Sequence, residues 1–277
     1  MIKIRSILLK IKKIFFSLSY KIKRFFRILL KIDQKMIIGN KKLLMPPEHN
    51  LSWYNIIYKE YDKYLPSLVS QISKNSSVID IGANIGDTVY RMLDSNPNLK
   101  YYCVEADDYF YGYLKRNKEL LNENLKERVI LINELVGENI KGILHKSEGG
   151  TATLIEKEDG IKSKTLDQII DEYKIKDIKL IKSDIDGYDY NALNSGMNEI
   201  ENNKPDLFFE CATLQQNSHE GFVSIIKKLE KIGYKNWSIL DNYGIVIFEK
   251  RKSTDVLNFL DRRKGDEFAI DIFCKEN

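Results

Sequence analysis

Residues that build disulfide frameworks and metal sites are scarce in this sequence. Its 277 residues include three cysteines and three histidines. Cys103, Cys211 and Cys274 are odd in number and far apart, so we expect no disulfide framework, no metal site and a reducing compartment. The histidines are equally scattered. His219, which follows a predicted strand, is more simply interpreted as a surface residue than as a base or a metal ligand.

Long hydrophobic runs are missing as well. A membrane-spanning helix needs about 20 predominantly apolar residues, whereas the longest uncharged run near the N-terminus covers residues 14–20 and contains two serines. Charges run through the surrounding segment, and no small-residue cleavage site follows it. We therefore expect neither a spanning helix nor a signal peptide.

Acidic residues are almost absent from the first part of the chain. Residues 1–42 hold 13 Lys and Arg against the single acid Asp33, a net charge of +12, while the remainder holds 31 basic and 39 acidic residues, a net charge of −8. Apolar side chains recur in this part at steps of three and four residues, opposite most of the basic ones. This apolar stripe consists of Ile4, Ile7, Leu8, Ile11, Ile14, Phe15, Leu18, Ile22, Phe25, Phe26, Leu29 and Ile32.

Such a pattern is typical of a helix that lies in a membrane interface. Ten basic residues precede Asp33, and each contributes about 1 kcal/mol near an anionic leaflet, so we predict that residues 1–32 bind an anionic membrane surface. The protein would then be cytoplasmic and peripheral on the inner face of the membrane. The alternative is an amphipathic helix packed on protein. Nucleic acid is not expected, because basic segments that follow phosphates usually lack so wide an apolar face.

Proline is also rare, and one pair of prolines marks a boundary. Pro46 and Pro47 stop any helix that reaches them. We therefore predict a basic amphipathic helix over residues 1–38, a linker over 39–50 and one domain over 51–277, which is long enough for one sizeable core. The sequence leaves the oligomeric state open.

The sequence contains a glycine-rich turn between a predicted strand and a predicted helix, which we call the corner. It matches neither of two common nucleotide-binding motifs, Gly-x-Gly-x-x-Gly and Gly-Lys-Ser/Thr. The corner reads Ser77-Val-Ile-Asp80-Ile-Gly82-Ala83-Asn84-Ile-Gly86-Asp87. It joins a β-branched run to a helical pattern, and its glycines allow positive φ and close backbone approach. This order resembles the first motif of class I S-adenosylmethionine (SAM) dependent methyltransferases. The resemblance implies that Asp80, Gly82, Ala83, Asn84 and Gly86 bind the cofactor.

The next predicted strand, residues 100–104, ends in Glu105 and Ala106. A carboxylate at that edge accepts two hydrogen bonds from the vicinal hydroxyls of a ribose, so we assign Glu105 and the adjoining Ala106 to the cofactor site. Asn133 ends the third strand and is placed to meet the adenine amino group, although a strand-end asparagine that forms a turn is an alternative.

Strand and helix patterns alternate from the corner onward, which predicts a mainly parallel sheet with helices on both faces. A closing pair of strands, residues 234–240 and 243–250, resembles the terminal antiparallel hairpin of class I methyltransferases. We therefore expect their α/β, Rossmann-like fold with a seven-stranded sheet. The aromatic helical pattern over residues 51–73 indicates a helix that closes the core or a lid over the site.

Several motifs follow one another in a specific order. They are Val-Ile-Asp-Ile-Gly-Ala-Asn-Ile-Gly from Val78, Val-Glu-Ala from Val104, Lys-Thr-Leu-Asp from Lys164, Lys-Ser-Asp-Ile-Asp-Gly-Tyr-Asp from Lys182 and Pro-Asp-Leu-Phe-Phe-Glu from Pro205. This succession, over roughly residues 70–250, resembles the FkbM family of SAM-dependent O-methyltransferases. The resemblance implies that the acceptor is a hydroxyl on a sugar of a surface glycan, nucleotide sugar or lipid-linked intermediate. One departure is Asp186, where the family usually has Glu.

Asp184 and Asp186 are the candidate catalytic residues. They follow the fourth parallel strand, at the edge where methyl donor and acceptor meet, and a carboxylate there can orient a hydroxyl and take its proton. Aspartates that cap the next helix are the simpler alternative. The same Asp-x-Asp would also suit a metal-dependent glycosyltransferase, and a non-catalytic SAM-fold module at a membrane is a third possibility.

Overall fold

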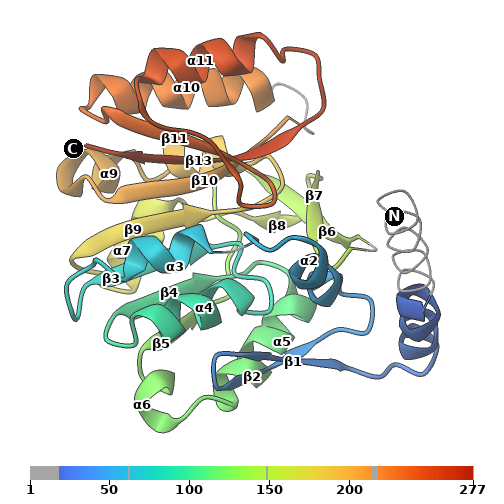
Figure 1. The fold of residues 1–277 in the computed structure, drawn as a ribbon. Coiled ribbons are helices and arrows are strands. Elements are labelled where there is room, and N and C mark those ends of the chain that lie inside the picture. Colours follow the sequence, from blue (N-terminus) through green and yellow to red (C-terminus); the bar gives the residue numbers. More distant parts are fainter. Residues whose placement is uncertain (1–18, 62, 148, 214–217, 277) are drawn as a thin grey trace, which may run out of the picture.

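The computed structural model describes residues 19–61, 63–147, 149–213 and 218–276. They form an eight-stranded central sheet with helices on both faces (Figure 1). In spatial order its strands are β12 (Val246–Arg251), β11 (Asn236–Asp241), β13 (Ala269–Lys275), β10 (Asp206–Ala212), β9 (Ile178–Ser183), β3 (Ser77–Ile81), β4 (Lys100–Val104) and β5 (Val129–Ile132).

The five strands from β10 to β5 run parallel, and β13, β11 and β12 add antiparallel pairs at the other side. Both faces of the parallel strands are buried, so β3, β5 and β9 are rich in Ile, Val and Leu, while β4 and β10 carry aromatic side chains. In β3, Val78 faces one apolar cluster and Ile79 the other. The expected mainly parallel α/β fold is therefore confirmed.

Helices from the two halves of the chain cover opposite faces of the sheet. One face packs on α7 (Leu166–Glu172), α8 (Asp189–Asn194), α9 (Met197–Asn203), α10 (Ser218–Lys231) and α11 (Ser253–Asp261). The other packs on α2 (Leu51–Ile57), α3 (Tyr64–Val69), α4 (Asp87–Ser95), α5 (Asp108–Glu119) and the short α6 (Glu123–Lys126). The ends of β3, β4 and β9 stay open between these layers.

The C-terminal part of the sheet is larger than expected. The predicted hairpin exists as β11 and β12, but β13 from the C-terminal end inserts between β10 and β11, so the sheet has eight strands rather than seven. Ile272 and Cys274 of β13 are completely buried. The sequence of β13 does not show which strands it pairs with, because pairing between strands that are distant in the chain depends on the tertiary structure.

A hairpin replaces the predicted linker and the predicted end of the first helix. β1 (Gln34–Ile38) and β2 (Lys41–Met45) pair antiparallel, and Leu43 and Met45 are fully buried against the α4 and α5 side of the domain. The buried Gln34 amide donates to the carbonyls of Pro46, Pro47 and His49. The sequence did not predict this hairpin because its burial depends on helices that come later in the chain.

A small separate sheet follows β5, with the order β7 (Ala152–Glu156), β6 (Lys141–Lys146) and β8 (Ile161–Lys162). Its strands β6 and β7 form an antiparallel hairpin, and Gly149 and Gly150 lie in the connection between them. It lies beside the open ends of the central strands.

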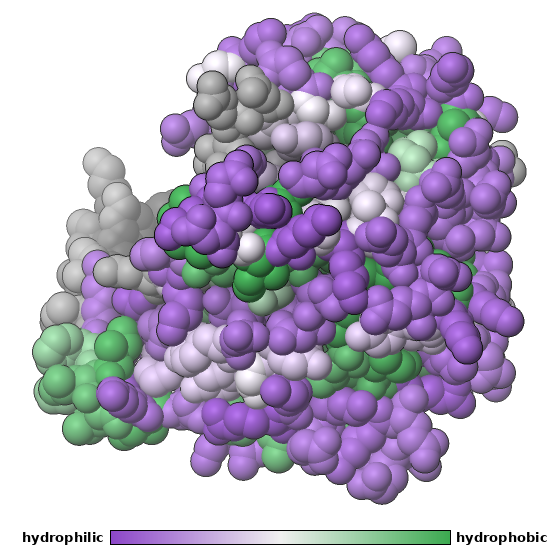
Figure 2. Space-filling view, turned by 180° about the vertical axis from the view of Figure 1, so that it is seen from behind, coloured by the Kyte–Doolittle hydropathy of each residue, from purple (hydrophilic) through white to green (hydrophobic). Residues whose placement is uncertain are grey.

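Residues 19–29 are helical, while the predicted helix before residue 19 lies outside the described residues. The helix contacts the domain on one side, where Tyr20 packs on Trp53 and Arg24 donates to the carbonyl of Glu48. Its other side exposes Ile22, Phe25, Phe26, Leu29 and Leu30, which contribute to the hydrophobic surface at one edge of the molecule (Figure 2). Within the described ranges, no helix has the length and apolarity needed to cross a membrane.

Candidate active site

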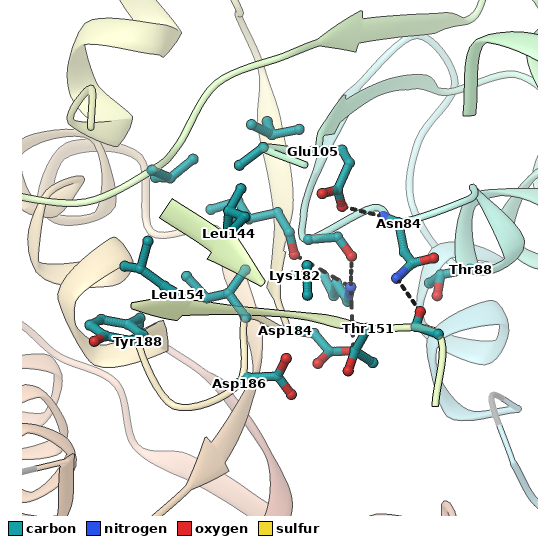
Figure 3. A pocket seen from close by; sticks show the side chains of 18 of the residues that line it. Asn84, Thr88, Glu105, Leu144, Thr151, Leu154, Lys182, Asp184, Asp186 and Tyr188 are labelled. Atoms are coloured by element: carbon teal, nitrogen blue, oxygen red, sulfur yellow. Dashed lines mark hydrogen bonds and ion pairs between the residues drawn. The ribbon is translucent and has the colours of Figure 1, made fainter. Parts of the chain in front are cut away.

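A cavity of about 250 Å³ opens where β3, β4 and β9 end (Figure 3). The glycine corner and Glu105 form one wall, and Asp184, Asp186 and Lys182 form another. Leu144, Leu154 and Tyr188 add an apolar wall from the small sheet and from the loop before α8. The cavity lies at the carboxyl edge of a parallel sheet, where ligands of such folds bind.

Gly82 allows the corner to pack against the end of β9. Its φ is +74°, and a Cβ there would overlap the main-chain carbonyl oxygen of Asp184. The absence of a side chain at Gly82 therefore lets the corner approach the backbone at Asp184. This contact places the corner next to the carboxylates of Asp184 and Asp186.

Asn84 holds three parts of the cavity wall together. It adopts the left-handed conformation with φ +49°, which asparagine tolerates better than most residues. Its Oδ1 accepts from the main-chain N–H of Ile85 at 2.8 Å, and its Nδ2 donates to the carbonyl of Gly150 at 2.9 Å. The Nε2 of His49 lies 3.3 Å from the same Oδ1. Asn84 thus ties the corner to the small sheet and to the segment before α2.

Glu105 is buried at the edge of the cavity. Its Oε2 accepts from the main-chain N–H of Asn84 at 2.7 Å, and its Oε1 accepts from that of Asp107 at 2.8 Å. Each carboxylate oxygen keeps a further lone pair for a ligand hydroxyl. Burial raises the pKa of Glu105 to about 7, although the two backbone donors oppose this shift.

The raised pKa of Glu105 predicts pH-dependent cofactor binding. A ribose hydroxyl donates better to the ionised carboxylate, which in the free protein becomes populated only as the pH rises through about 7. We expect the Kd for SAM to be about tenfold weaker at pH 6 than at pH 8, as a single titrating group dictates. Calorimetry at both pH values on the wild type and on Glu105→Gln measures this, and the variant should have lost the dependence. A slope that persists in Glu105→Gln would assign it to another group.

Several residues assigned to the cofactor from the sequence do not line the cavity. Ala83 and Gly86 support the corner from behind, where a Cβ on Gly86 would meet Leu114. Asn133 is exposed and donates to the carbonyls of Glu105 and Ala106, which ties the end of β5 to the end of β4. A cofactor contact by Asn133 stays a prediction, as does each of these assignments.

Asp80 is fully buried and forms an ion pair with Lys182, with 2.9 Å between Oδ1 and Nζ. Lys182 also donates to the carbonyl of Gly82 at 3.1 Å and lies 3.6 Å from an oxygen of Asp184. Burial opposes the charge on Lys182, but Asp80 and Asp184 outweigh it and raise the pKa of the lysine. Lys182 thus joins the corner to the acceptor edge. Sequence analysis assigned no role to Lys182, because the sequence of a buried strand does not show which residue its lysine will pair with.

Asp184 and Asp186 are both free of the helix-capping role that was considered for them. The N-cap of α8 is Tyr188, which makes no side-chain capping hydrogen bond. The carboxylate of Asp189 stabilises the loop before the helix, because it accepts from the hydroxyl of Ser183 at 2.6 Å and from the N–H groups of Ile185 and Gly187. Asp184 is exposed, whereas Asp186 is half-buried.

Asp186 combines an unusual backbone with a raised pKa. Its φ is +52° and it precedes Gly187 at +95°, a conformation that costs free energy and is found preferentially at functional sites. Burial and the neighbouring charge of Asp184 raise the pKa of Asp186 to about 6. A carboxylate with that pKa is a better proton acceptor near neutral pH than an ordinary aspartate.

Two further wall residues were missed by sequence analysis. His49 was treated as scattered, but it is buried beside Asn84, and burial lowers its pKa. Gly150 has a φ of +97°, and a Cβ on it would meet the imidazole ring of His49 at 2.7 Å. The paired glycines were the one available signal, because they let the small sheet approach the corner closely. His219, in contrast, lies away from the cavity and contacts the carbonyl of Leu260.

Two features are typical of the class I methyltransferase fold. They are the order of the strands in the central sheet and the glycine corner next to Glu105 at the end of β4. A family model described as the methyltransferase FkbM domain matches residues 80–235, more than half of the chain, and the chain belongs to this family. The family assignment indicates SAM as the cofactor. Among the described residues, no three His, Cys, Asp or Glu side chains converge to hold a metal ion.

Comparison with solved structures gives distant matches. A methyltransferase FkbM from Methylobacillus flagellatus KT is 18% identical, with a TM-score of 0.45, over 80% of this chain and 50% of its own. This chain therefore spans half the length of that protein. TYW2 from M. jannaschii in complex with AdoMet is 12% identical over 88% and 86% of the two chains, with a TM-score of 0.41. A SAM-dependent O-methyltransferase from Thermotoga maritima is 10% identical over 78% and 64%, with a TM-score of 0.43. No curated protein matches the sequence.

The wall of the cavity fits the chemistry of SAM. Glu105 offers acceptors to ribose hydroxyls, and apolar side chains such as Leu135 and Leu144 suit a purine ring. The corner and Thr88 at the start of α4 offer polar groups to the amino-acid end of the cofactor, next to Asp184.

Proposed function

We propose that this protein is an O-methyltransferase that methylates a hydroxyl of a sugar in a surface glycan, nucleotide sugar or lipid-linked intermediate. The observation that supports it most is the pair Asp184 and Asp186, which face the cofactor cavity while Asp189 satisfies the loop around them. Sugar hydroxyls are weak nucleophiles, so their methylation requires a group that orients the oxygen and accepts its proton.

SAM supplies an electrophilic methyl group when it is bound. Asp184, exposed at the cavity edge, accepts a hydrogen bond from the acceptor and orients the reacting oxygen. Asp186 takes the proton of that hydroxyl, since its pKa of about 6 lies near neutral pH. Among the described residues, Lys182 pairs with Asp184 and not with Asp186. Lys182 holds Asp184 against the corner.

Labelled SAM tests this function directly. The full chain is incubated with methyl-labelled SAM and with glycan, lipid-linked and nucleotide-sugar fractions from the cells that produce it. We expect label in a carbohydrate fraction as an alkali-stable methyl ether. Label on protein or on a carboxylate as a labile ester would contradict the sugar hydroxyl. SAM binding without transfer to any fraction would favour a non-catalytic module.

We also propose that the N-terminal segment holds the enzyme on an anionic membrane, with the catalytic domain beginning at β1. The apolar side of the helix over residues 19–29 faces away from the domain, with Phe25 and Leu29 each 62% exposed. Lys21, Lys23 and Lys31 are exposed around it. An apolar face of this size beside basic side chains suits the interface of an anionic leaflet.

Removal of residues 1–32 is expected to abolish binding to anionic vesicles while the domain stays folded. The truncation retains Asp33, which accepts from Tyr113 and pairs with Arg116 at 2.6 Å, and it retains the whole β1–β2 hairpin. Co-sedimentation with phosphatidylserine vesicles measures binding, and thermal melting checks the fold. A truncation that begins at Asn40 is a poorer test, because it removes β1. Equal co-sedimentation of the truncated and full chains would disprove the proposed anchor.

A further inference from the structure

The small sheet has two faces of different character. Its inner face carries Leu144 and Leu154, which line the cofactor cavity. Its outer face carries Ile143 and Ile155, which lie directly opposite each other in the β6–β7 register and are 43% and 50% exposed. Two exposed isoleucines alone are not unusual on a protein surface, so the charges around them decide what this face can bind.

Lysines accompany this apolar pair. Lys141 precedes Ile143 by two residues and therefore shares its face, and Lys162 lies directly opposite Lys141 in the β6–β8 register. Both lysines are exposed. The one acid among the residues of these three strands, Glu156, lies on the inner face, where it accepts from the hydroxyl of Tyr188 at 3.3 Å. Like charges directly opposite each other destabilise a strand pair, so an anionic surface that met the outer face would relieve their repulsion.

This combination suits an anionic lipid leaflet better than a second copy of the chain. A twofold contact through the same face would bring the lysines of two copies together. Anionic headgroups would instead pair with the lysines, and the isoleucines would reach the boundary between headgroups and acyl chains. Two basic and two apolar side chains are too few to hold a protein on a membrane. The outer face would therefore orient an enzyme that residues 1–32 anchor.

The small sheet and the N-terminal helix contact the same short segment of the cavity wall. Arg24 of the helix donates to the carbonyl of Glu48, and the N–H of Asn50 donates to the carbonyl of Gly149 in the β6–β7 connection at 3.1 Å. His49, between these two contacts, lines the cavity. The small sheet and the helix lie on the same side of the domain (Figure 1). A leaflet that contacted both would therefore lie beside the cavity.

We propose that the outer face of the small sheet, with Lys141, Ile143, Ile155 and Lys162, is a second membrane contact and that the acceptor is a sugar carried by a lipid of the same leaflet. A lipid-linked sugar stays at the membrane surface where the cavity is held, so the contact helps to bring the two together. A nucleotide sugar dissolved in water gains nothing from this orientation. The inference rests on the proposed sugar O-methylation and on the proposed N-terminal anchor.

Tryptophan fluorescence tests the membrane contact independently of activity. Ile155→Trp is introduced into the full chain, and vesicles of brominated phosphatidylcholine with phosphatidylserine are added. The variant should lose more of its emission than the wild type, because the new indole reaches the brominated acyl chains. Leu120→Trp is the matched control, since Leu120 is 44% exposed at the end of α5 that lies away from the cavity.

The control should lose no more emission than the wild type. Equal loss in Ile155→Trp and in the wild type, with both bound to the vesicles, would overturn the second contact. If the full chain does not bind these vesicles at all, the proposed anchor and the second contact fail together.

The distribution of labelled product identifies the class of acceptor. The full chain is incubated with methyl-labelled SAM, membranes of the cells that produce it and their soluble nucleotide sugars, and the lipids are extracted with organic solvent before hydrolysis. Label in a methyl sugar released from the lipid fraction supports the inference. Label that enters nucleotide sugars or finished glycans without appearing in the lipid fraction overturns it but leaves the proposed function intact. Absence of label from every carbohydrate, with SAM binding retained, overturns both.

Charge reversal then connects the contact with the acceptor. Lys141→Glu combined with Lys162→Glu should lower transfer to the lipid-linked sugar in anionic vesicles by about tenfold, the scale of two basic residues near such a leaflet. SAM affinity and the melting temperature should stay near wild type, because both side chains point away from the cavity. Lys227→Glu combined with Lys231→Glu, on exposed positions of α10, is the matched control and should leave transfer unchanged. An equal loss in neutral detergent micelles would contradict a role at the membrane.

Discussion

Asp186→Asn is expected to lower turnover by roughly 10²-fold or more, the usual scale for losing a general base. The amide keeps the size of the side chain and most of its hydrogen bonding, but it cannot take the proton of an acceptor hydroxyl. Among the described residues no ion pair involves Asp186, its carboxylate does not cap α8, and Asp189 stabilises the loop around it. We therefore expect the melting temperature and the SAM affinity to stay near wild type, and steady-state kinetics with calorimetry measures both.

The pH profile separates Asp186 from Asp184. The ionised form of Asp186 accepts the proton, so kcat/KM of the wild type should fall as the pH drops through about 6. In the Asp186→Asn variant, kcat/KM should no longer show this fall at low pH, which is the acidic limb of the pH profile. Asp184→Asn should also lower turnover, because the acceptor is less well oriented, but should retain the limb. If the limb disappears in Asp184→Asn instead, the base is Asp184, and Asp186 serves the shape of the loop.

The local fold around the candidate site, which the sequence predicted correctly, is encoded within short stretches of the chain. The corner from Asp80 to Gly86 reads as strand, turn and helix in one short stretch, and the spacing to Glu105 fits one strand–helix–strand unit. The hydrogen bond from the Asn84 N–H to Glu105 is a direct result of the two strands lying side by side. Motif order along the chain was sufficient to identify the fold and the family.

The parts that sequence missed arise from contacts between distant segments. His49 meets Asn84 and Gly150, 35 and 66 positions from that asparagine, only after the small sheet folds over the corner. β2 appeared to be a linker because Leu43 and Met45 are buried by α5, which follows much later. Neither arrangement leaves a periodic pattern within one segment, which is the signal that sequence analysis uses.

Asp80 illustrates how a correctly located motif residue can have another task. Its place in the corner implied cofactor binding, yet its side chain is fully buried beneath the turn, where it pairs with Lys182. Alternation along β3 puts Asp80 on the same face as Val78, towards the α4 side of the sheet, and Lys182 reaches it from the neighbouring strand β9. Asp80 therefore acts through Lys182, which contacts both the corner at Gly82 and the carboxylate of Asp184.

Lys182→Met is expected to destabilise the protein by about 3–5 kcal/mol, because it leaves the carboxylate of Asp80 buried without its partner. For a chain of this size the loss corresponds to a fall in the melting temperature of roughly 10 °C. Thermal melting and urea unfolding measure it. A melting temperature equal to wild type would mean that Asp80 is protonated in the fold and that the ion pair contributes little.

The double variant Asp80→Leu with Lys182→Met separates stability from function. Replacing a buried ion pair by apolar side chains of similar size is often neutral for stability, so the double variant should regain most of the melting temperature. Its methyl transfer should nevertheless remain at least tenfold below wild type, because the contacts of Lys182 with the carbonyl of Gly82 and with Asp184 are still missing. If both the melting temperature and the turnover recover, Lys182 serves only the stability of the fold. Recovery of stability alone would establish it as the residue that positions Asp184 against the cofactor corner.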